Sequence, residues 1–191
     1  MQPEVARRLV HATGSVVPLA YLVDLLTWGQ VRTVLLVAIA LALVIEAVRL
    51  LVGLELPLVE RMIRGYEEDY LAGYALYIFG GGVTGLVFEP SIAVPAILML
   101  TIADPISGLL GGDELRTVKH PHVLAVTFIV CLGLAWWSLK PTAAVAAALV
   151  ATLADGVKPV IRGYVIDDNL TIPLGAATAA FVVIEYGPGL L

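Results

Sequence analysis

Residues 165–173, with the sequence VIDDNLTIP, place two adjacent carboxylates and an amide directly before the last long apolar run of the chain. Asp168 or Asn169 is expected to cap the helix that follows, because Pro173 falls in its first turn, where a backbone donor is dispensable. A cap uses one polar group and leaves a carboxylate free, and a helix N-terminus attracts phosphate. The stretch therefore predicts either a simple cap or a cap beside a metal-bound anion, and Asp167 and Asp168 are both candidates for either role.

The composition of the chain is that of an integral membrane protein. Its 191 residues are 60% hydrophobic and 14% charged, whereas soluble domains carry about a quarter charged residues. The alternating ten-residue segments of an outer-membrane barrel are missing, so an all-α bundle is expected. Residues 1–191 are expected to form a single membrane domain, with the lone Cys131 packed as a small hydrophobe.

Apolar segments predict about seven transmembrane helices, since a helix needs about 20 apolar residues to cross the bilayer. The predicted spans are residues 9–26, 33–52, 71–88, 92–110, 123–139, 143–160 and 170–184, and the first is interrupted by Gly14 and Pro18. Residues 55–66 have the pattern of a short amphipathic helix lying at the membrane interface. Three consecutive glycines at 80–82 predict tight packing or a break in the third span, and Pro105 predicts a break in the fourth.

The basic residues predict the orientation of these spans. With seven spans, nine of the eleven Lys and Arg residues fall on the side of the N-terminus, which the positive-inside rule makes cytoplasmic. A carboxylate at membrane depth costs about 2.5 to 3.5 kcal/mol and normally faces the interior of the bundle. Most of the unusual polar residues lie on that same side, which predicts a pocket facing the cytoplasm. They are Arg8, His11, Glu46, Arg49, Glu67, Asp104, Lys119, Asp155, Asp167, Asp168 and Asn169.

Two pairs of these residues also have a purely structural explanation. Glu46 and Arg49 are three residues apart, as are Arg8 and His11, so each pair can interact along one helix face or contact a lipid headgroup. The sequence leaves both possibilities open.

Motifs spread over most of the chain carry a resemblance to a known family. They are EVARRLVH at 4–11, EAVR at 46–49, residues 64–67 and 73–77, ADPISG at 103–108, ATL at 151–153 with Asp155, and DDNLTIPL at 167–174. In these motifs the chain resembles the membrane-embedded polyprenol kinase family, which includes dolichol kinase, phytol kinase and the CTP-dependent diacylglycerol kinase of yeast. It is also similar to the CTP-using phosphatidate cytidylyltransferases. It departs from the usual family pattern at Ala103 in place of Gly, at Asp155 in place of Glu, and after Lys119, where only the lysine carries over.

The resemblance implies transfer of the γ phosphate of CTP to the hydroxyl of a long isoprenoid alcohol, with Mg²⁺ or another divalent cation as cofactor. The expected partners are therefore a membrane lipid and a nucleoside triphosphate, and no nucleic acid. Phosphoryl transfer needs cationic groups on the triphosphate and a positioned hydroxyl, with little covalent chemistry from the protein. The chain lacks the G-x-x-x-x-G-K-[ST] phosphate loop, which excludes a conventional ATP-binding fold.

The resemblance also assigns roles to the polar residues. Asp104 and Asp168, with Asp167 or Asp155 in support, are expected to hold the metal and the triphosphate. Lys119 and Arg116 are expected to pair with phosphate oxygens. The other expected site residues are Ser107, Gly108 and Asn169 at the phosphates, Arg8, His11, Glu46 and Arg49 at the lipid or its headgroup, and Glu67 or Asp155 as the base or hydroxyl orienter.

Two other functions stay open at this point. A cytidylyltransferase would use the same pocket, CTP and metal, but a lipid phosphate would attack the α phosphorus of CTP. A transporter or a non-catalytic membrane scaffold belongs to another class. Transport predicts carboxylates near the middle of the membrane, whereas most of those in this chain fall toward one side.

Overall fold

The computed structural model describes residues 8–9, 11–53, 70–111, 118–157, 160–161 and 164–187, with residues 160, 161, 164 and 165 described by their backbone alone. Over these ranges the chain forms seven continuous helices and one short hairpin, which confirms the predicted all-α class. The predicted interfacial helix at 55–66 lies outside the described residues.

The elements follow one another as short-looped helices. They are α2 (Val16–Leu22), α3 (Trp28–Ala47) with a π-helical extension (Val48–Val52), α5 (Gly73–Val87), α6 (Pro90–Leu98), a π-helical segment (Met99–Ala103), α7 (Asp104–Gly111), α8 (Pro121–Trp136), α9 (Pro141–Gly156), β1 (Val160–Ile161), β2 (Tyr164–Val165) and α10 (Asp168–Tyr186). The hairpin pairs β1 with the antiparallel β2 in the loop before α10. No strand was expected from the sequence, and this pair occupies only the connection between two helices.

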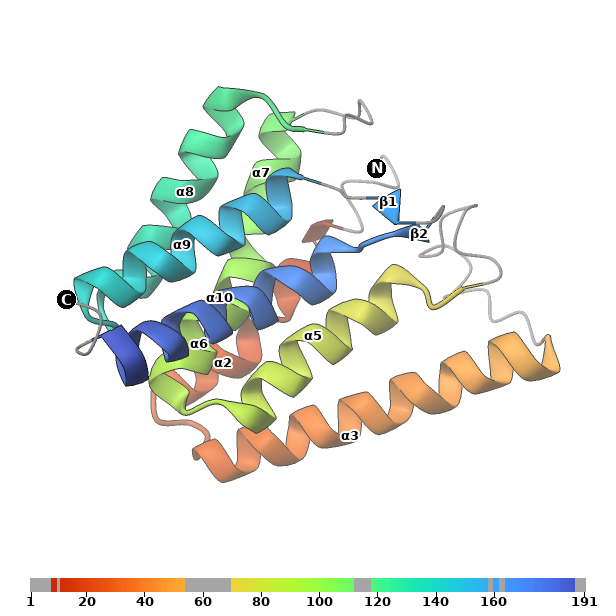
Figure 1. Cartoon of the computed structure of the whole chain (residues 1–191). Coiled ribbons are helices and arrows are strands. Elements are labelled where there is room, and N and C mark those ends of the chain that lie inside the picture. The colour runs from red at the N-terminus through yellow and green to blue at the C-terminus, as the bar shows by residue number, and fades with distance from the viewer. Residues whose placement is uncertain are drawn as a thin grey trace.

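The long helices alternate in direction, so that the same end of the bundle collects the polar ends of most of them. In Figure 1 the ends of α3, α7 and α9 and the starts of α5, α8 and α10 lie on the side of the bundle that runs from the top of the view to its right. Helix α10 packs between α9 and α5, and α8 packs against the other flank of α9. The described N-terminal residues lie toward the same edge.

Three helices are long and apolar enough to cross a membrane: Trp28–Val52, Pro90–Gly111 and Asp168–Tyr186. Helices α5, α8 and α9 are apolar but have only 15, 16 and 16 residues. At 1.5 Å per residue they reach about 24 Å, which is less than the roughly 30 Å of the hydrocarbon core. The prediction of about seven transmembrane helices is therefore confirmed only in part.

The first predicted span, residues 9–26, is interrupted at Gly14 as expected, but it continues through Pro18. A turn at Gly14 and Ser15 separates a short helical stretch from α2, which has seven residues. Asp24 then takes a left-handed conformation with φ of 57°, which a β-carbon disfavours, and the chain reverses direction toward α3. Thr27 and Gln30 form a reciprocal capping box that fixes the start of α3.

The fourth predicted span is a continuous helix instead of a broken one. It runs from Pro90 to Gly111 without interruption, although Pro105 lies within it. A proline removes one backbone donor and its ring clashes with the carbonyl four residues earlier. The π-helical segment Met99–Ala103 lies just before Pro105, and such a local widening accommodates an interrupted ladder. This helix is the centre of the bundle, with 72% of its apolar window buried inside the protein.

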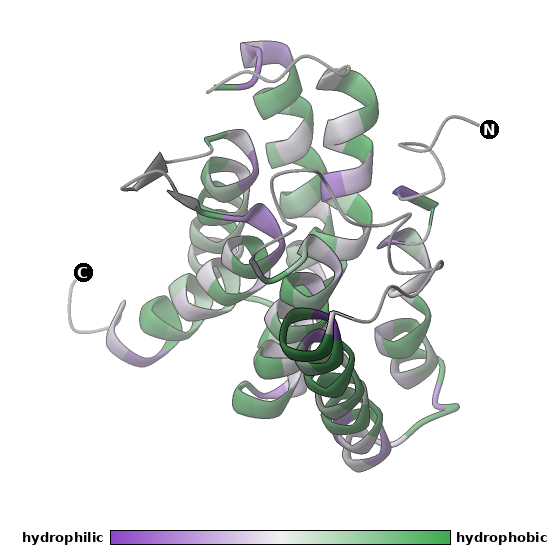
Figure 2. Cartoon of the chain, turned by 90° about the vertical axis from the view of Figure 1, so that its right-hand side faces the viewer, coloured by the Kyte–Doolittle hydropathy of each residue, from purple (hydrophilic) through white to green (hydrophobic). Residues whose placement is uncertain are grey.

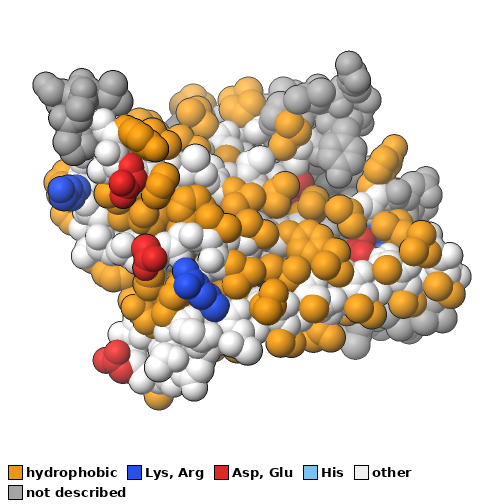
Figure 3. Space-filling view, turned by 60° about the horizontal axis from the view of Figure 1, so that its bottom comes forward, with side chains coloured by type: hydrophobic (Ala, Val, Ile, Leu, Met, Phe, Trp, Pro, Cys, Tyr) orange, Lys and Arg blue, Asp and Glu red, His pale blue; other side chains and the backbone are white. Residues whose placement is uncertain are grey.

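The outer faces of the helices carry the apolar surface of a membrane-embedded bundle. Only 11% of the apolar window of Trp28–Val52 is buried by the protein. In Figure 2 the helices are green along most of their length, with purple segments near many of their ends. Hydrophobic side chains likewise cover most of the middle of the face in Figure 3, and charged side chains lie toward its ends. Such a surface suits contact with lipid tails.

Helix α5 runs unbroken through its three glycines, so tight packing and not a helix break explains them. Gly80 lies against the first turn of α10. A β-carbon on Gly80 would lie 2.3 Å from the backbone oxygen of Asn169 and 3.1 Å from the Cα of Leu170. Gly81 has more space around it, because a β-carbon added there would lie 4.0 Å from its nearest neighbour, the Cγ2 of Ile97.

We expect Gly80→Ala to destabilise the protein by about 1–3 kcal/mol, because the added methyl group forces backbone apart in a packed core. Gly81→Ala is the matched control, and it should be neutral or stabilising by up to about 1 kcal/mol, since alanine favours the helix. Unfolding of both variants in mixed micelles, followed by circular dichroism, measures the difference. Equal stability of the two variants would contradict the close approach of α5 and α10.

Candidate functional site

Three carboxylates from three helices meet at the polar end of the bundle. Asp104 begins α7, Asp155 lies in the last turn of α9, and Asp168 begins α10. Each offers a carboxylate oxygen, and these three oxygens all lie within 4.8 Å of one another. Asp155 and Asp168 are buried, with 1% and 6% of their surface exposed, and Asp104 is partly buried. We call these three residues the carboxylate cluster.

Lys119 and Ser107 surround one member of the cluster. The Lys119 Nζ lies 2.6 Å from Asp155 Oδ1 and donates a second hydrogen bond of 2.9 Å to Ser107 Oγ. The Ser107 hydroxyl in turn donates to Asp155 Oδ2 at 2.6 Å. Both oxygens of Asp155 are therefore engaged. An ammonium group has three donors, and Asp155 and Ser107 take two of those of Lys119.

Backbone pairing brings Lys119 to Asp155, although they are 36 residues apart in the chain. The Lys119 N–H donates to the carbonyl of Gly156 at 3.0 Å, and Val118 forms an isolated antiparallel bridge with Val157. The segment before α8 is thus fixed along the end of α9. Its lysine then reaches the carboxylate that α9 turns into the bundle.

The N-terminal residues cover another side of the cluster. His11 Nδ1 lies 3.5 Å from Asp104 Oδ2, and the imidazole stacks on the ring of Tyr77 with centroids 4.3 Å apart. The Tyr77 hydroxyl donates to the carbonyl of His11 at 2.7 Å. Arg8 lies over Gly108, where a β-carbon would meet the Arg8 Nε at 2.9 Å. Glycine at 108 therefore allows the guanidinium to approach the backbone of α7.

The two adjacent aspartates at the start of α10 have separate positions. Asp167 is the N-cap, and its Oδ1 accepts a 2.8 Å hydrogen bond from the N–H of Asn169. Asp168 is the first residue of the helix and belongs to the carboxylate cluster. Pro173 is the sixth residue of α10, so the expectation that it lies in the first turn is wrong. The cap is thus Asp167, and neither Asp168 nor Asn169 takes that position.

Asn169 carries a buried side-chain oxygen without a hydrogen-bond partner among the described residues. It is 5% exposed and follows Asp168 directly. Its Oδ1 accepts no hydrogen bond from any residue that the structure describes. Buried polar atoms are normally paired, and an orphaned oxygen asks for an explanation such as a bound ion or water.

Glu46 and Arg49 form a separate buried network where α3 ends and α5 begins. Arg49 donates to both carboxylate oxygens of Glu46, at 3.1 and 2.7 Å, and also to the carbonyl of Tyr70. Glu46 further accepts from the Ala72 N–H at 3.2 Å and from the Tyr74 hydroxyl at 2.5 Å. These contacts join two helix ends, so the structural explanation of the Glu46–Arg49 pair accounts for the observed geometry.

Most of the predicted site residues therefore gather at one end, with two differences. Asp155, which was predicted only as a supporting ligand of the metal, lies in the carboxylate cluster, while Asp167 caps α10. Glu67 and Arg116 lie outside the described residues. Tyr74 and Tyr77 were not chosen as site residues. Their spacing of three residues at the polar start of a helix was the signal that could have found them.

The carboxylate cluster fits a divalent cation. Two oxygen ligands of one Mg²⁺ lie at most about 4.2 Å apart, so the three carboxylates need only a small inward shift to share one ion. Without a cation, a pair of charges 4.8 Å apart repels by about 3 kcal/mol at an effective dielectric constant of 20. Lys119 offsets the charge of Asp155. The residues best placed to hold a metal are Asp104, Asp155 and Asp168.

No protein-family model, curated protein or solved structure matches this chain.

Proposed function

We propose that the chain is a membrane-embedded, metal-dependent lipid kinase that transfers the γ phosphate of CTP to the hydroxyl of a long-chain isoprenoid alcohol. The observation that carries this proposal is the carboxylate cluster of Asp104, Asp155 and Asp168 beside Lys119, buried at one end of an apolar bundle. Carboxylates that share a divalent cation, together with a lysine, are the groups that a triphosphate needs. The choice of CTP and of a lipid alcohol follows the resemblance to the polyprenol kinases.

The proposed roles follow the positions of the side chains. Asp104, Asp155 and Asp168 hold the cation, which would neutralise charge on the triphosphate. Lys119 has a third donor for a phosphate oxygen, and Arg8 and His11 lie on the side of the cluster formed by α7 and α5. The polar end of the bundle is proposed to face the cytoplasm, because the positive-inside rule assigns that side.

The transfer itself is an in-line displacement. The oxygen of the lipid hydroxyl attacks the γ phosphorus, the bond from that phosphorus to the bridging oxygen breaks, and CDP leaves with the electron pair. The hydroxyl proton passes to a carboxylate. Both oxygens of Asp155 are engaged by Lys119 and Ser107, which favours Glu67 over Asp155 as the proton acceptor.

The test uses the purified full-length chain in lipid vesicles with Mg²⁺, a panel of lipid alcohols and CTP labelled at either phosphate. We expect label from the γ phosphate, and none from the α phosphate, in the lipid product. If a lipid phosphate serves as acceptor and the lipid product carries label from the α phosphate, the protein is a cytidylyltransferase and not a kinase. Absence of labelled lipid from either nucleotide, with a correctly folded protein and every acceptor, would overturn enzymatic use of CTP.

A further inference from the structure

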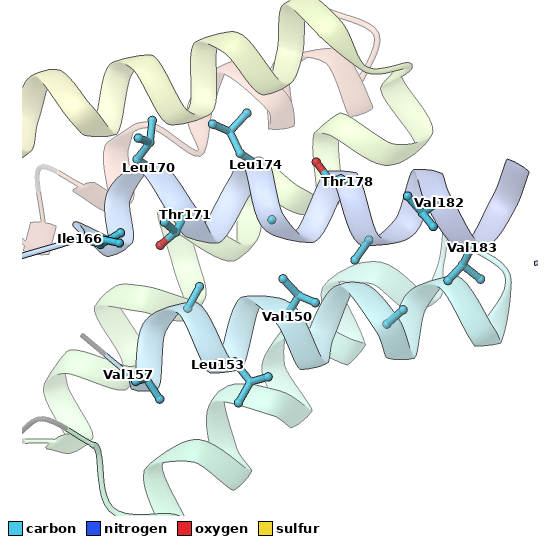
Figure 4. Close-up of a pocket in the computed structure, with 14 residues that line it drawn as sticks. Val150, Leu153, Val157, Ile166, Leu170, Thr171, Leu174, Thr178, Val182 and Val183 are labelled. Carbon is cyan, nitrogen blue, oxygen red and sulfur yellow. The ribbon is translucent and has the colours of Figure 1, made fainter. Parts of the chain in front are cut away.

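An apolar groove runs along the outer side of α9 and α10. Its volume is about 960 Å³, and among its fourteen lining residues only Thr171 and Thr178 carry a polar side chain. Figure 4 shows the two helices side by side, with Ile166 at one end of the groove and Val182 and Val183 at the other. Small residues shape its floor, namely Ala146, Ala154, Gly175 and Ala179.

The groove begins at the same helix ends that hold two members of the carboxylate cluster. Helix α9 turns Asp155 into the bundle and presents Leu153, Ala154 and Val157 to the groove. Helix α10 buries Asp168 and contributes Leu170 and Thr171, and Ile166 lies two residues before the helix begins. A molecule lying in the groove would thus have one end beside the helix ends that carry Asp155 and Asp168, and the rest against apolar side chains.

The length of the groove restricts what can fill it. Leu170 and Val183 are thirteen residues apart on α10, which corresponds to about 20 Å at 1.5 Å per residue. One leaflet of the hydrocarbon core is about 15 Å deep. The groove is therefore longer than one leaflet is deep, and it offers one channel between two helices. These features favour one hydrocarbon chain that is longer than a leaflet is deep.

We propose that this groove binds the single hydrocarbon chain of the acceptor lipid, with the hydroxyl at the Ile166 end, and that the groove selects long chains over short ones. This inference rests on the proposed lipid kinase function for the identity of the hydroxyl. The binding itself is independent of CTP. A two-chained bilayer lipid would leave one chain outside the groove, and a second copy of the protein would leave the helix ends at the cluster without a hydroxyl.

Photolabelling tests the occupant without relying on catalysis. The probe is a single-chain isoprenoid alcohol with a diazirine at the end far from the hydroxyl, added to the full chain in phosphatidylcholine vesicles without nucleotide. We expect cross-links near Val182 and Val183, suppressed by unlabelled geranylgeraniol but far less by geraniol or a diacylglycerol. Label spread evenly over α3 and α8, or no competition by the long alcohol, would overturn the proposal. A disulfide between two copies through Leu153→Cys, in a Cys131→Ala background, would assign the groove to self-association and also overturn it.

Two substitutions narrow the groove, and one matched change leaves it open. In Gly175→Leu the new side chain starts 2.9 Å from Val150 Cγ1, inside the groove. Gly133→Leu adds the same group to an exposed position of α8 where a β-carbon meets no atom within 4 Å. We expect Gly175→Leu to weaken binding of the long alcohol probe about tenfold, the effect of losing roughly two buried methylenes, and Gly133→Leu to leave it unchanged. Ala179→Leu is the second groove variant if Gly175→Leu fails to fold.

The outcomes separate this inference from the proposed function. Cross-linking in the groove that geranylgeraniol suppresses, without phosphorylation of any lipid, would support the groove as the binding site and contradict the kinase function. If wild type, Gly175→Leu and Ala179→Leu phosphorylate a long alcohol with the same KM, the kinase function is supported and the groove is not the acceptor site.

Discussion

Replacing Asp168 by Asn is expected to lower phosphoryl transfer to the lipid by about a thousandfold, since a catalytic cation contributes several kcal/mol to the transition state. Asp168 lies in the carboxylate cluster and offers an oxygen within 4.8 Å of those of Asp104 and Asp155. The amide keeps the shape of the side chain but loses its charge. Binding of Mn²⁺, followed by electron paramagnetic resonance, should weaken in parallel with the rate.

The adjacent aspartate supplies the matched control. Asp167 caps α10 through its Oδ1 and the N–H of Asn169. Asparagine is about as good a cap as aspartate, so Asp167→Asn should change activity and Mn²⁺ affinity by no more than about threefold. Equal losses in the two variants would mean that the start of α10 acts as a unit and would contradict the division between cap and ligand. Unchanged activity in Asp168→Asn would show that the carboxylate cluster takes no part in the reaction.

Lys119→Met is expected to cost about 3–5 kcal/mol of stability when divalent cations are removed by a chelator. The substitution leaves Asp155, which is 1% exposed, close to two other carboxylates, with the Ser107 hydroxyl still donating a hydrogen bond to it. Breaking a buried ion pair from one side leaves a charge without compensation, which is the source of the large cost. Unfolding in mixed micelles with and without chelator measures it.

A double-mutant cycle shows whether the loss comes from the Lys119–Asp155 pair. Adding Asp155→Asn to Lys119→Met removes the isolated charge and should recover a large part of the stability. Lys140→Met is the control, because Lys140 is exposed and stands before the first residue of α9, at the opposite end of that helix. A loss in Lys119→Met that Asp155→Asn does not reduce would place the effect in the segment before α8 and not in the ion pair.

Hydropathy predicted the helices well because it is a local property of the chain. The segments expected at 71–88, 123–139 and 143–160 correspond to α5, α8 and α9, with ends that differ by a few residues. Hydropathy alone could not predict the continuity through Pro18 or through Pro105. The first depends on where α2 begins, and the second on the π-helical segment that absorbs the proline.

The candidate site was predicted as a set of residues but not as a set of contacts. Placing polar residues on one side of the membrane brought Asp104, Lys119, Asp155 and Asp168 to the same end of the bundle. It left Asp155 and Asp167 equivalent as supporting ligands. Only the backbone geometry at the start of α10 separates a cap from a ligand, since both residues are aspartates.

The amino-acid sequence was sufficient to assign an all-α bundle with apolar helices and with its polar residues collected at one end, because composition and hydropathy act residue by residue. The three-dimensional packing decided which groups meet. Asp104, Asp155 and Asp168 lie on three different helices, and their contact depends on how α7, α9 and α10 cross. The same packing of α9 against α10 leaves the apolar groove on the outer side, and no periodicity along a single helix encodes a space between two.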